Sequence, residues 1–244
     1  MTPLAGILSL TRAQRNMEPS EVFVIIPAFN EGAVLRSTVA GVAKFGYTVV
    51  VVDDGSAIPA ESYLGGLNAY ILRHVVNLGQ GASLRTGAEF ALARGAAVIV
   101  HFDADGQHSP ELIERLIDPI VRGCSEVALG SRFLNENDRR LVPRPKRVLL
   151  KTGAIVSWMF TGVRLSDTHN GFRAFSRSAA GKIQLRESGF AHATEILGLI
   201  RRAKLSYVEV PVTIRYTDYS RAKGQKISNS FNIVIDLMLR KLFK

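Results

Sequence analysis

The sequence has a single cysteine and no long apolar run. Because Cys124 has no second cysteine to pair with, no disulfide can form within the chain, as is typical of a reducing compartment such as the cytoplasm. No segment reaches the ~18–20 consecutive apolar residues that a membrane-spanning helix needs. The apolar stretch 4–10 has no basic residue before it and no small-residue cleavage site after it, so we expect no signal peptide.

Acidic residues are in the minority. The chain has 31 lysines and arginines against 21 aspartates and glutamates, a formal net charge of +10. A basic chain favours anionic partners such as nucleic acid, anionic lipid or phosphorylated substrates. Zinc-finger spacing, RNA-binding aromatic motifs and helix-turn-helix signatures are missing from the sequence. We therefore expect phosphorylated substrates or a lipid surface as partners, and no nucleic acid.

The first half of the chain alternates β-branched runs with helical stretches. The pattern predicts buried strands at 22–26, 47–52, 69–73, 97–102 and 126–129, and helices at 30–44, 80–94 and 109–122. This alternation predicts an α/β fold, with a mostly parallel, Rossmann-like sheet and helices on both faces. Ligands of such sheets bind beyond the carboxyl ends of the strands, where polar clusters follow the second, fourth and fifth predicted strands.

The pattern changes after Asn135. The sequence predicts a basic loop at 135–151, a helix ending near Met159, a strand at 172–175, a helix at 192–203, extended segments at 207–210 and 212–216, and a last helix from Ile227. We divide the chain into a flexible leader (1–20), a main domain (21–220), and a basic loop with an amphipathic helix (221–244).

Two carboxylates follow the fourth predicted strand, with Ala104 between them. A turn after the strand can direct Asp103 and Asp105 at one point. Such a pair suits Mg²⁺ or Mn²⁺ shared with substrate phosphates, and the metal would neutralise a diphosphate leaving group. The alternative is a solvated turn, and Gln107 and His108 are ambiguous as additional ligands.

Three more polar groups lie at strand ends or helix starts. Asp53 and Asp54 can hydrogen-bond a ribose or base, or form an ordinary Asp-Gly turn. The glycine-punctuated segment 77–81 can offer backbone amides to a phosphate, although it lacks the Gly-Lys-Ser/Thr of a P-loop. Arg132 can bind phosphate bidentately or make a surface ion pair.

These groups belong to an ordered series of motifs. The series is Pro27-Ala28-Phe29-Asn30-Glu31, Asp53-Asp54-Gly55-Ser56, Asn77-x-Gly79-x-Gly81, Asp103-Ala104-Asp105-Gly106-Gln107-His108-Ser109-Pro110, Gly130-Ser131-Arg132, Asp167-Thr168-His169-Asn170-Gly171-Phe172-Arg173-Ala174-Phe175 and Glu209-Val210-Pro211-Val212. Over roughly residues 22–240 it resembles glycosyltransferase family 2, in particular the branch of dolichol- and polyprenyl-phosphate sugar synthases such as the dolichyl-phosphate mannose synthases.

The resemblance implies a GT-A fold, in which a Rossmann-like sheet is merged with a small C-terminal acceptor-binding portion. It also implies metal-dependent transfer of a hexose, mannose or glucose first among them, from a GDP- or UDP-sugar to a polyprenyl phosphate, with inversion at the anomeric carbon. The implied nucleotide and donor pocket consists of Pro27, Ala28, Asn30, Glu31, Asp53, Asp54, Asn77, Gly81, Asp103, Ala104 and Gln107. Within this pocket Asp53 would recognise uracil or guanine.

The resemblance further implies a catalytic group of Asp105, Arg132 and Asp167, with Asp103, Asp105 and Gln107 holding the metal. The residues implied to contact acceptor or donor phosphates are Arg132, Arg173, Arg221 and Lys226. Asp167 would act as general base toward an acceptor hydroxyl. A lipid phosphate is already an anion and needs no base, so Asp167 would then hold the sugar or the metal. A loop cap is its structural alternative.

One motif of that branch is changed in this chain. The Gly-x-Ser-Lys element usual after Glu-Val-Pro-Val is replaced by a basic stretch with Gly224, Gln225 and Lys226, without the serine. A saccharide hydroxyl, as in cell-surface polysaccharide synthesis, is therefore kept as an alternative acceptor. A catalytically inactive nucleotide-binding module is the non-enzyme alternative.

Two segments combine basic residues with an apolar face, at 144–160 and 227–244. Both suit the interface of an anionic membrane, where apolar burial adds to the attraction of lysine and arginine. The alternatives are packing against the core or against a partner subunit, so a homo-oligomer stays open. We expect a peripheral protein on the cytoplasmic face of a membrane.

Overall fold

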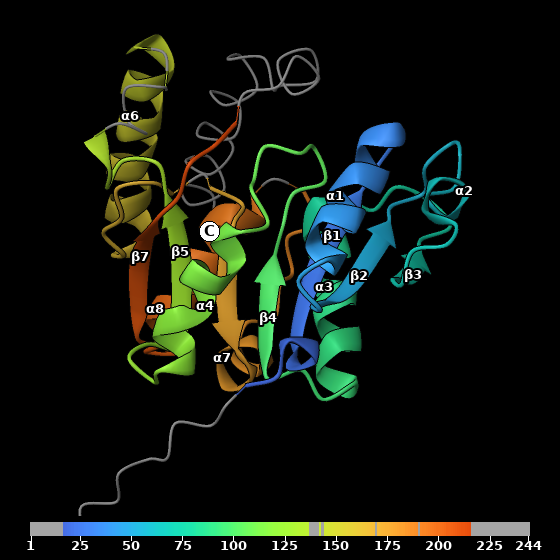
Figure 1. The fold of residues 1–244 in the computed structure, drawn as a ribbon. Coiled ribbons are helices and arrows are strands. Elements are labelled where there is room, and N and C mark those ends of the chain that lie inside the picture. The colour runs from blue at the N-terminus through green and yellow to red at the C-terminus, as the bar shows by residue number, and fades with distance from the viewer. Residues whose placement is uncertain (1–16, 137–141, 143, 169, 190, 216–244) are drawn as a thin grey trace, which may run out of the picture.

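The computed structural model describes residues 17–136, 142, 144–168, 170–189 and 191–215. Within these residues the strands form one sheet in the order β3-β2-β1-β4-β6-β5-β7 (Figure 1). Their bounds are β1 Val22–Ala28, β2 Thr48–Asp53, β3 Tyr70–Arg73, β4 Val98–His101, β5 Val127–Ser131, β6 Arg173–Ser176 and β7 Tyr207–Pro211. Neighbouring strands are parallel except that β6 runs antiparallel to both β4 and β5. The expected mostly parallel α/β sheet is confirmed.

The helices cover both faces of this sheet. Their bounds are η1 Pro19–Glu21, α1 Ala33–Ala43, α2 Glu61–Leu64, α3 Gln80–Ala93, α4 Leu112–Val121, α6 Arg144–Thr161, α7 Arg177–Lys182 and α8 His192–Arg202. Buried side chains of α1 and α4 share one core cluster with Val24 and Ile26 of β1. Those of α3, α7 and α8 share the other cluster with Phe23 and Ile25. Successive side chains of β1 enter different cores, so both faces of the strand are buried and consecutive residues of it are apolar.

Helix α6 lies on the β7 side of the sheet and packs against α8 (Figure 1). The prediction of a loop through Lys151 is wrong, because the helix already begins at Arg144. Pro145 is compatible with that start, since the first turn of a helix needs no backbone donor at this position. Its lysines and arginines are also good helix formers. The basic residues therefore belong to the first turns of a helix.

The start of α4 also differs from the sequence prediction. The sequence predicts a helix from residue 109. Instead, the carbonyls of Ser109 and Pro110 accept from the amides of Leu112 and Ile113 in a preceding turn, and the helix begins at Leu112. The other strands and helices predicted within the described residues are present, with ends shifted by one or a few residues, except that the extended segment predicted at 212–216 forms only an isolated bridge at Ile214 within its described part.

The antiparallel strand β6 determines which segments meet. The parallel strands β1, β2, β4 and β5 all end at one edge of the sheet, which we call the carboxyl-end rim. Because β6 runs the other way, the segment before it, residues 166–172, arrives at the same rim. After β7, Ile214 forms an antiparallel bridge with His108, so this segment also lies there. Residues 1–16 of the predicted leader, the segment 216–226 and the expected last helix lie outside the described residues, whereas residues 19 and 20 of the leader belong to η1.

Candidate active site

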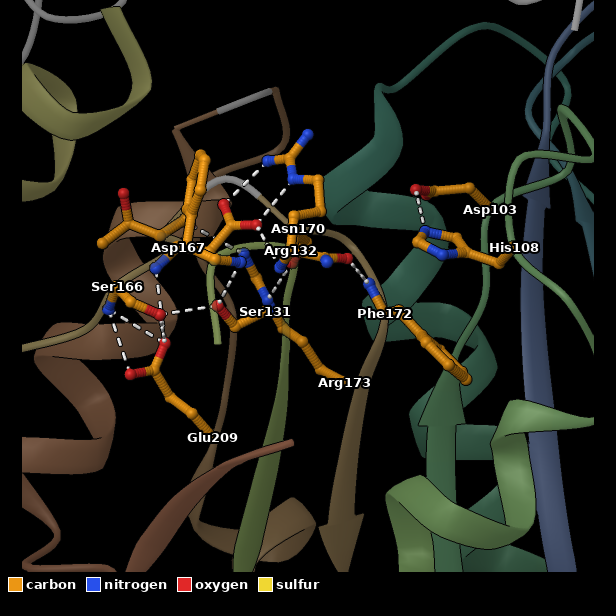
Figure 2. A network of polar contacts seen from close by, with 12 residues as sticks. Asp103, His108, Ser131, Arg132, Ser166, Asp167, Asn170, Phe172, Arg173 and Glu209 are labelled. Carbon is orange, nitrogen blue, oxygen red and sulfur yellow. Dashed lines mark hydrogen bonds and ion pairs between the residues drawn. The ribbon is translucent and has the colours of Figure 1, made fainter. Parts of the chain in front are cut away.

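The carboxyl-end rim brings together acidic and basic side chains from distant parts of the sequence. Asp53 and Asp54 follow β2, Asp103 and Asp105 follow β4, and Arg132 follows β5. The segment that leads into β6 adds further polar groups to these strand ends. Figure 2 shows part of this group: the Asp103–His108 contact, and the contacts of Arg132 with the segment before β6.

Asp103 is fixed by two neighbours and is still partly open to solvent. Its Oδ1 accepts from Nε2 of Gln80 at 3.1 Å, and its Oδ2 lies 3.4 Å from Nε2 of His108. His108 is buried against the rings of Phe102 and Phe172, at centroid distances of 5.8 and 5.0 Å. Burial by itself would raise the pKa of Asp103, but the hydrogen bond and charge of His108 outweigh it and lower that pKa. Asp103 is thereby held as an anion.

Asp105 is bonded by Gln107, whose backbone amide and side-chain Nε2 donate to its two oxygens at 3.0 and 2.6 Å. Burial and the nearby charge of Asp103 raise the pKa of Asp105. Two neighbouring carboxylates that repel each other fit a divalent cation, which would relieve their repulsion. No cluster of three or more His, Cys, Asp or Glu ligands occurs among the described residues.

Gly171 explains how the segment before β6 reaches this acidic group. A Cβ atom added to Gly171 would lie 2.5 Å from Oδ2 and 2.8 Å from Oδ1 of Asp103. Any larger residue would displace the carboxylate or the segment. The glycine of the Asn-Gly-Phe-Arg motif therefore makes room for Asp103, a role that spacing alone does not indicate.

Asp53 shapes the loop after β2. Its Oδ1 accepts from the Ser56 amide at 2.9 Å, its Oδ2 accepts from the Ala60 amide at 3.0 Å, and its side chain is fully buried. Asn30 joins the same loop, because its side-chain oxygen accepts from the Ala57 amide at 3.0 Å. Asn30 has a positive φ of 54°, which asparagine tolerates well. Contact of Asp53 with a nucleotide base stays a prediction.

Asp54 holds the glycine-punctuated segment. Its oxygens accept from the amides of Leu78 and Gly79 at 3.0 and 2.7 Å, and His74 Nδ1 lies 2.7 Å from Oδ1. His74 in turn lies 2.9 Å from the Thr86 hydroxyl on α3. Asp54 thus links β2, β3 and the start of α3.

The glycines at the start of α3 accommodate another loop. The Gly81 amide donates to the Ser188 carbonyl at 2.7 Å. Added Cβ atoms at Gly79 and Gly81 would collide with the carbonyl oxygens of Ser188 and Glu187 respectively. Glu195 supports this loop by accepting from the amide of Glu187 at 2.9 Å. A contact of Gly81 with a nucleotide phosphate would need this loop to move, and it stays a prediction.

Arg132 and Asp167 form a buried, bidentate ion pair. Nε of Arg132 donates to Oδ2 of Asp167 at 2.6 Å and Nη2 donates to Oδ1 at 2.7 Å, while the Arg132 amide also donates to Oδ2 at 3.2 Å (Figure 2). The two residues are 6% and 4% exposed. Both oxygens of Asp167 are therefore used by Arg132. The sequence predicted that each residue acts at the site, but it did not predict that they pair.

Glu209 on β7 supports the same segment. Its Oε1 accepts from the Ser166 amide and hydroxyl at 2.9 and 2.7 Å, and from the Asp167 amide at 3.3 Å. The Ser166 hydroxyl also lies 2.6 Å from the Ser131 hydroxyl at the end of β5 (Figure 2). In the sequence, Glu209 belongs to the Glu-Val-Pro-Val motif, which by itself indicates no role for this side chain.

Arg173 lies beneath the segment it follows. Its Nε donates to the Asn170 carbonyl at 2.9 Å and its Nη2 to the Thr168 carbonyl at 3.3 Å, and the residue is buried. Burial lowers the pKa of Arg173 to about 10, against the opposing charges of Asp103 and Asp167. These contacts agree with a structural role, and a contact with phosphate stays a prediction.

The remaining predicted residues are distributed around the rim. Pro27 and Ala28 end β1 beside Val52 and Asp53 of β2. The Ala104 carbonyl accepts from the Thr38 hydroxyl at 3.0 Å. Glu31 is half-buried in the segment before α1, and Asn77 is exposed in the loop after β3. Arg221 and Lys226 lie outside the described residues.

A mostly parallel sheet with this order of strands and an acidic turn after β4 defines a GT-A fold. The crystal structure of M. tuberculosis glucosyl-3-phosphoglycerate synthase superposes with a TM-score of 0.62 at 19% identity, covering 89% of this chain and 77% of that one. This similarity confirms the expected fold class.

Sequence comparisons define the family. The model of glycosyl transferase family 2 matches residues 23–184. The UDP-N-acetylglucosamine–dolichyl-phosphate N-acetylglucosaminyltransferase of Methanococcus voltae is 31% identical over 243 residues, covering 91% of this chain and 97% of that protein. The polyprenol monophosphomannose synthase of Mycolicibacterium smegmatis is 32% identical over 230 residues, covering 89% and 86%. The chain belongs to glycosyl transferase family 2, and the predicted resemblance is confirmed.

Proposed function

We propose that this chain transfers a hexose from a GDP- or UDP-sugar to a polyprenyl phosphate, with inversion at the anomeric carbon. The buried pairing of Asp167 with Arg132 carries this proposal. Transfer to a hydroxyl needs a base that can take a proton, and both oxygens of Asp167 already accept from Arg132. A phosphate acceptor needs no base. The two relatives named for transfer to lipid phosphates, similar over nearly the whole chain, support the same acceptor.

The donor would bind between β2 and β4. The proposed metal ligands are Asp103 and Asp105, with the Gln107 side chain as a further candidate. Mg²⁺ or Mn²⁺ bound there would neutralise charge on the diphosphate leaving group. The chain's own residues supply the frame: His108 and Gln80 orient Asp103. The proposed nucleotide contacts come from the loops at Asn30–Glu31, Asp53–Asp54 and Asn77–Gly81.

Arg132 would act beside the leaving group or the acceptor phosphate. Its charge is partly neutralised by Asp167, but arginine can bind a phosphate oxygen with a donor that its carboxylate partner does not use. Asp167 would keep the guanidinium in a fixed orientation. Arg173 would contribute by holding the backbone of the segment before β6, and Arg221 and Lys226 would add charge from the segment after β7.

Helix α6 would rest on the membrane surface. The exposed apolar residues of this helix are Val148, Ile155, Trp158 and Met159. Ala154, Ser157 and Thr161 form its buried face. Exposed apolar side chains beside lysines and arginines suit an anionic lipid interface, which we propose is the cytoplasmic face. In the part of the chain that the structure describes, no helix is long and apolar enough to cross a membrane. The alternative is that a second copy of the chain packs against the exposed apolar residues of α6.

A donor and acceptor screen tests this proposal. Purified protein with Mg²⁺ or Mn²⁺ would be given GDP- and UDP-hexoses with undecaprenyl or dolichyl phosphate, and nucleoside diphosphate release would be measured. We expect release that depends on the lipid phosphate and a product with inverted anomeric configuration by NMR. Release only with saccharide acceptors would favour the hydroxyl alternative. Metal-dependent nucleotide binding without release from any donor would favour an inactive module.

The Asp167→Asn variant sharpens the test of acceptor chemistry. If the acceptor is a phosphate, this variant should weaken transfer without abolishing it, because Asp167 only orients Arg132. If the acceptor is a hydroxyl, it should abolish transfer, because the base is lost. A fold check by circular dichroism is needed for this variant, since it leaves Arg132 without its charged partner.

A further inference from the structure

Glu209 accepts hydrogen bonds from one short segment, the one that carries Asp167. Three donors meet its carboxylate: the Ser166 amide, the Ser166 hydroxyl and the Asp167 amide, at distances from 2.7 to 3.3 Å. The donors lie 42 or 43 residues away in the sequence. A carboxylate that accepts several hydrogen bonds holds a segment more firmly than one neutral acceptor would.

The segment held by Glu209 is also joined to β5. The Ser166 hydroxyl lies 2.6 Å from that of Ser131, whose oxygen accepts from the Phe133 amide at 3.2 Å. Arg132, which lies between Ser131 and Phe133 in the sequence, pairs with Asp167. Glu209 and Ser131 therefore hold the two backbone segments that carry the ion pair. In Figure 2 the Glu209 carboxylate faces Ser166, while the Arg132 guanidinium faces the carboxylate of the next residue, Asp167.

We infer that Glu209 is a positioning residue for transfer, which sets the orientation of the Arg132–Asp167 pair through Ser166. The inference rests on the proposed function, which places Arg132 beside the leaving group or the acceptor phosphate. Glu209 itself touches neither substrate nor metal in this scheme. Its effect is indirect: if the segment shifts, Asp167 turns and the guanidinium of Arg132 turns with it.

The paired strands β5 and β7 offer a matched control at their other end. Glu126, just before β5, accepts from the amide and hydroxyl of Ser206, just before β7, at 3.1 and 3.4 Å. Glu209 and Glu126 thus make the same kind of contact, a carboxylate that binds a serine backbone amide and hydroxyl. Only Glu209 makes it at the carboxyl-end rim. If Glu209 only joined β7 to its neighbours, as Glu126 joins β5 to the start of β7, neither variant would change kcat.

The experiment compares Glu209→Ala, Glu209→Gln and Glu126→Ala in the full chain. For Glu209→Ala we expect kcat to fall by roughly 10- to 100-fold, since small misplacements at a reacting centre cost about this much. The KM for the nucleotide sugar should stay within about twofold, because the proposed donor contacts follow β2 and β4. Glu209→Gln keeps one acceptor oxygen for the Ser166 amide and should recover much of the activity. Glu126→Ala should keep kcat within about twofold.

Hydrogen exchange of the peptide covering residues 164–168 provides a readout that does not need turnover. Exchange there should rise in Glu209→Ala and stay unchanged in Glu126→Ala. Equal kcat in Glu209→Ala and Glu126→Ala, or a loss in donor KM alone, would overturn the inference. If the wild-type chain turns over no donor with any acceptor, the proposed function fails instead. Unchanged exchange in Glu209→Ala would then show that Glu209 does not hold the segment.

Discussion

The two halves of the carboxyl-end rim are built in different ways. In the half formed by β1, β2 and β4, turns supply many of the polar contacts: Asp53 binds amides three and seven residues further on, and Asp105 is bonded by Gln107. In the half formed by β5, β6 and β7, the paired residues are distant in the sequence: Arg132 and Asp167 are 35 positions apart. The first half combines such turns with contacts between successive strands and helices, such as Asp54 with Gly79, whereas the second half depends on strands that are distant in the sequence.

The two halves also differ in charge. Asp103 and Asp105 lie side by side, and their repulsion contributes to the raised pKa of Asp105. Across the rim, Asp167 is matched by Arg132 and both are buried. One half therefore favours an added cation, while the other is already close to neutral. This contrast predicts that metal affects the first half and that the second half contributes more to stability.

The largest effect is expected where the cation would bind. Asp103→Asn removes a charge from the proposed metal site, so kcat/KM should fall by about 10³-fold or more, equal to several kcal/mol of transition-state stabilisation. Chelation of divalent ions should abolish transfer by the wild type, and added Mg²⁺ or Mn²⁺ should restore it. Asp118→Asn, which alters an exposed pair with Arg122, is the control. Activity of Asp103→Asn above a tenth of wild type would contradict the assignment.

The buried pair should contribute most to stability. Arg132→Ala leaves the Asp167 carboxylate buried without its charged partner and should lower the free energy of unfolding by about 3–5 kcal/mol. Arg122→Ala breaks an exposed pair with a similar Nε–Oδ1 distance of 2.7 Å and should cost no more than about 1 kcal/mol. Urea unfolding followed by circular dichroism measures both. Equal losses would show that burial does not distinguish the two pairs.

Gly171 joins the two halves and should give an intermediate effect. The methyl group of Gly171→Ala would displace the Asp103 carboxylate, so kcat/KM should fall by roughly 10²-fold. The matched variant is Gly181→Ala in α7, where an added Cβ meets nothing within 4 Å. That change should leave activity unaltered and stabilise the helix slightly. The comparison fails if both variants retain wild-type kinetics.

The smallest effect is a pH-dependent one at Asp54. Burial alone would raise the pKa of Asp54, but hydrogen bonds from His74, Leu78 and Gly79 hold it below the ordinary value of 3.8. A lowered folded-state pKa stabilises the fold above the unfolded-state pKa, and this contribution is lost as the pH falls through the folded-state pKa. Asp54→Asn should therefore cost about 1–3 kcal/mol near neutral pH and progressively less below pH 3.8.

Urea unfolding of wild type and Asp54→Asn across this pH range measures the difference. The exposed Glu61 provides a control in the same half, and Glu61→Gln should change the unfolding free energy little at any pH. A difference for Asp54→Asn that grows as the pH falls would have the wrong sign for this explanation.

Local sequence determined the order of strands and helices and the residues at the strand ends. The apolar runs at β1, β2 and β4 predict buried strands because both of their faces are covered, and the motifs around Asp53 and Asp103 follow them directly. Helix boundaries were less predictable. The basic stretch before Lys151 looked like a loop, yet it enters α6, because helix propensity and packing against α8 outweigh the polar composition.

The contacts that complete the site were decided by tertiary structure. No local pattern indicates that Asp167 pairs with Arg132, that Gly171 faces Asp103, or that Glu209 supports Ser166. These contacts exist because β6 is inserted antiparallel between β4 and β5, which returns the segment before it to the carboxyl-end rim. The sequence alone therefore determined which chemical groups the protein carries at its strand ends. Only the pairing of distant strands decided which of these groups neutralise or support one another, because hydrogen bonds and ion pairs depend on distances that the folded sheet sets.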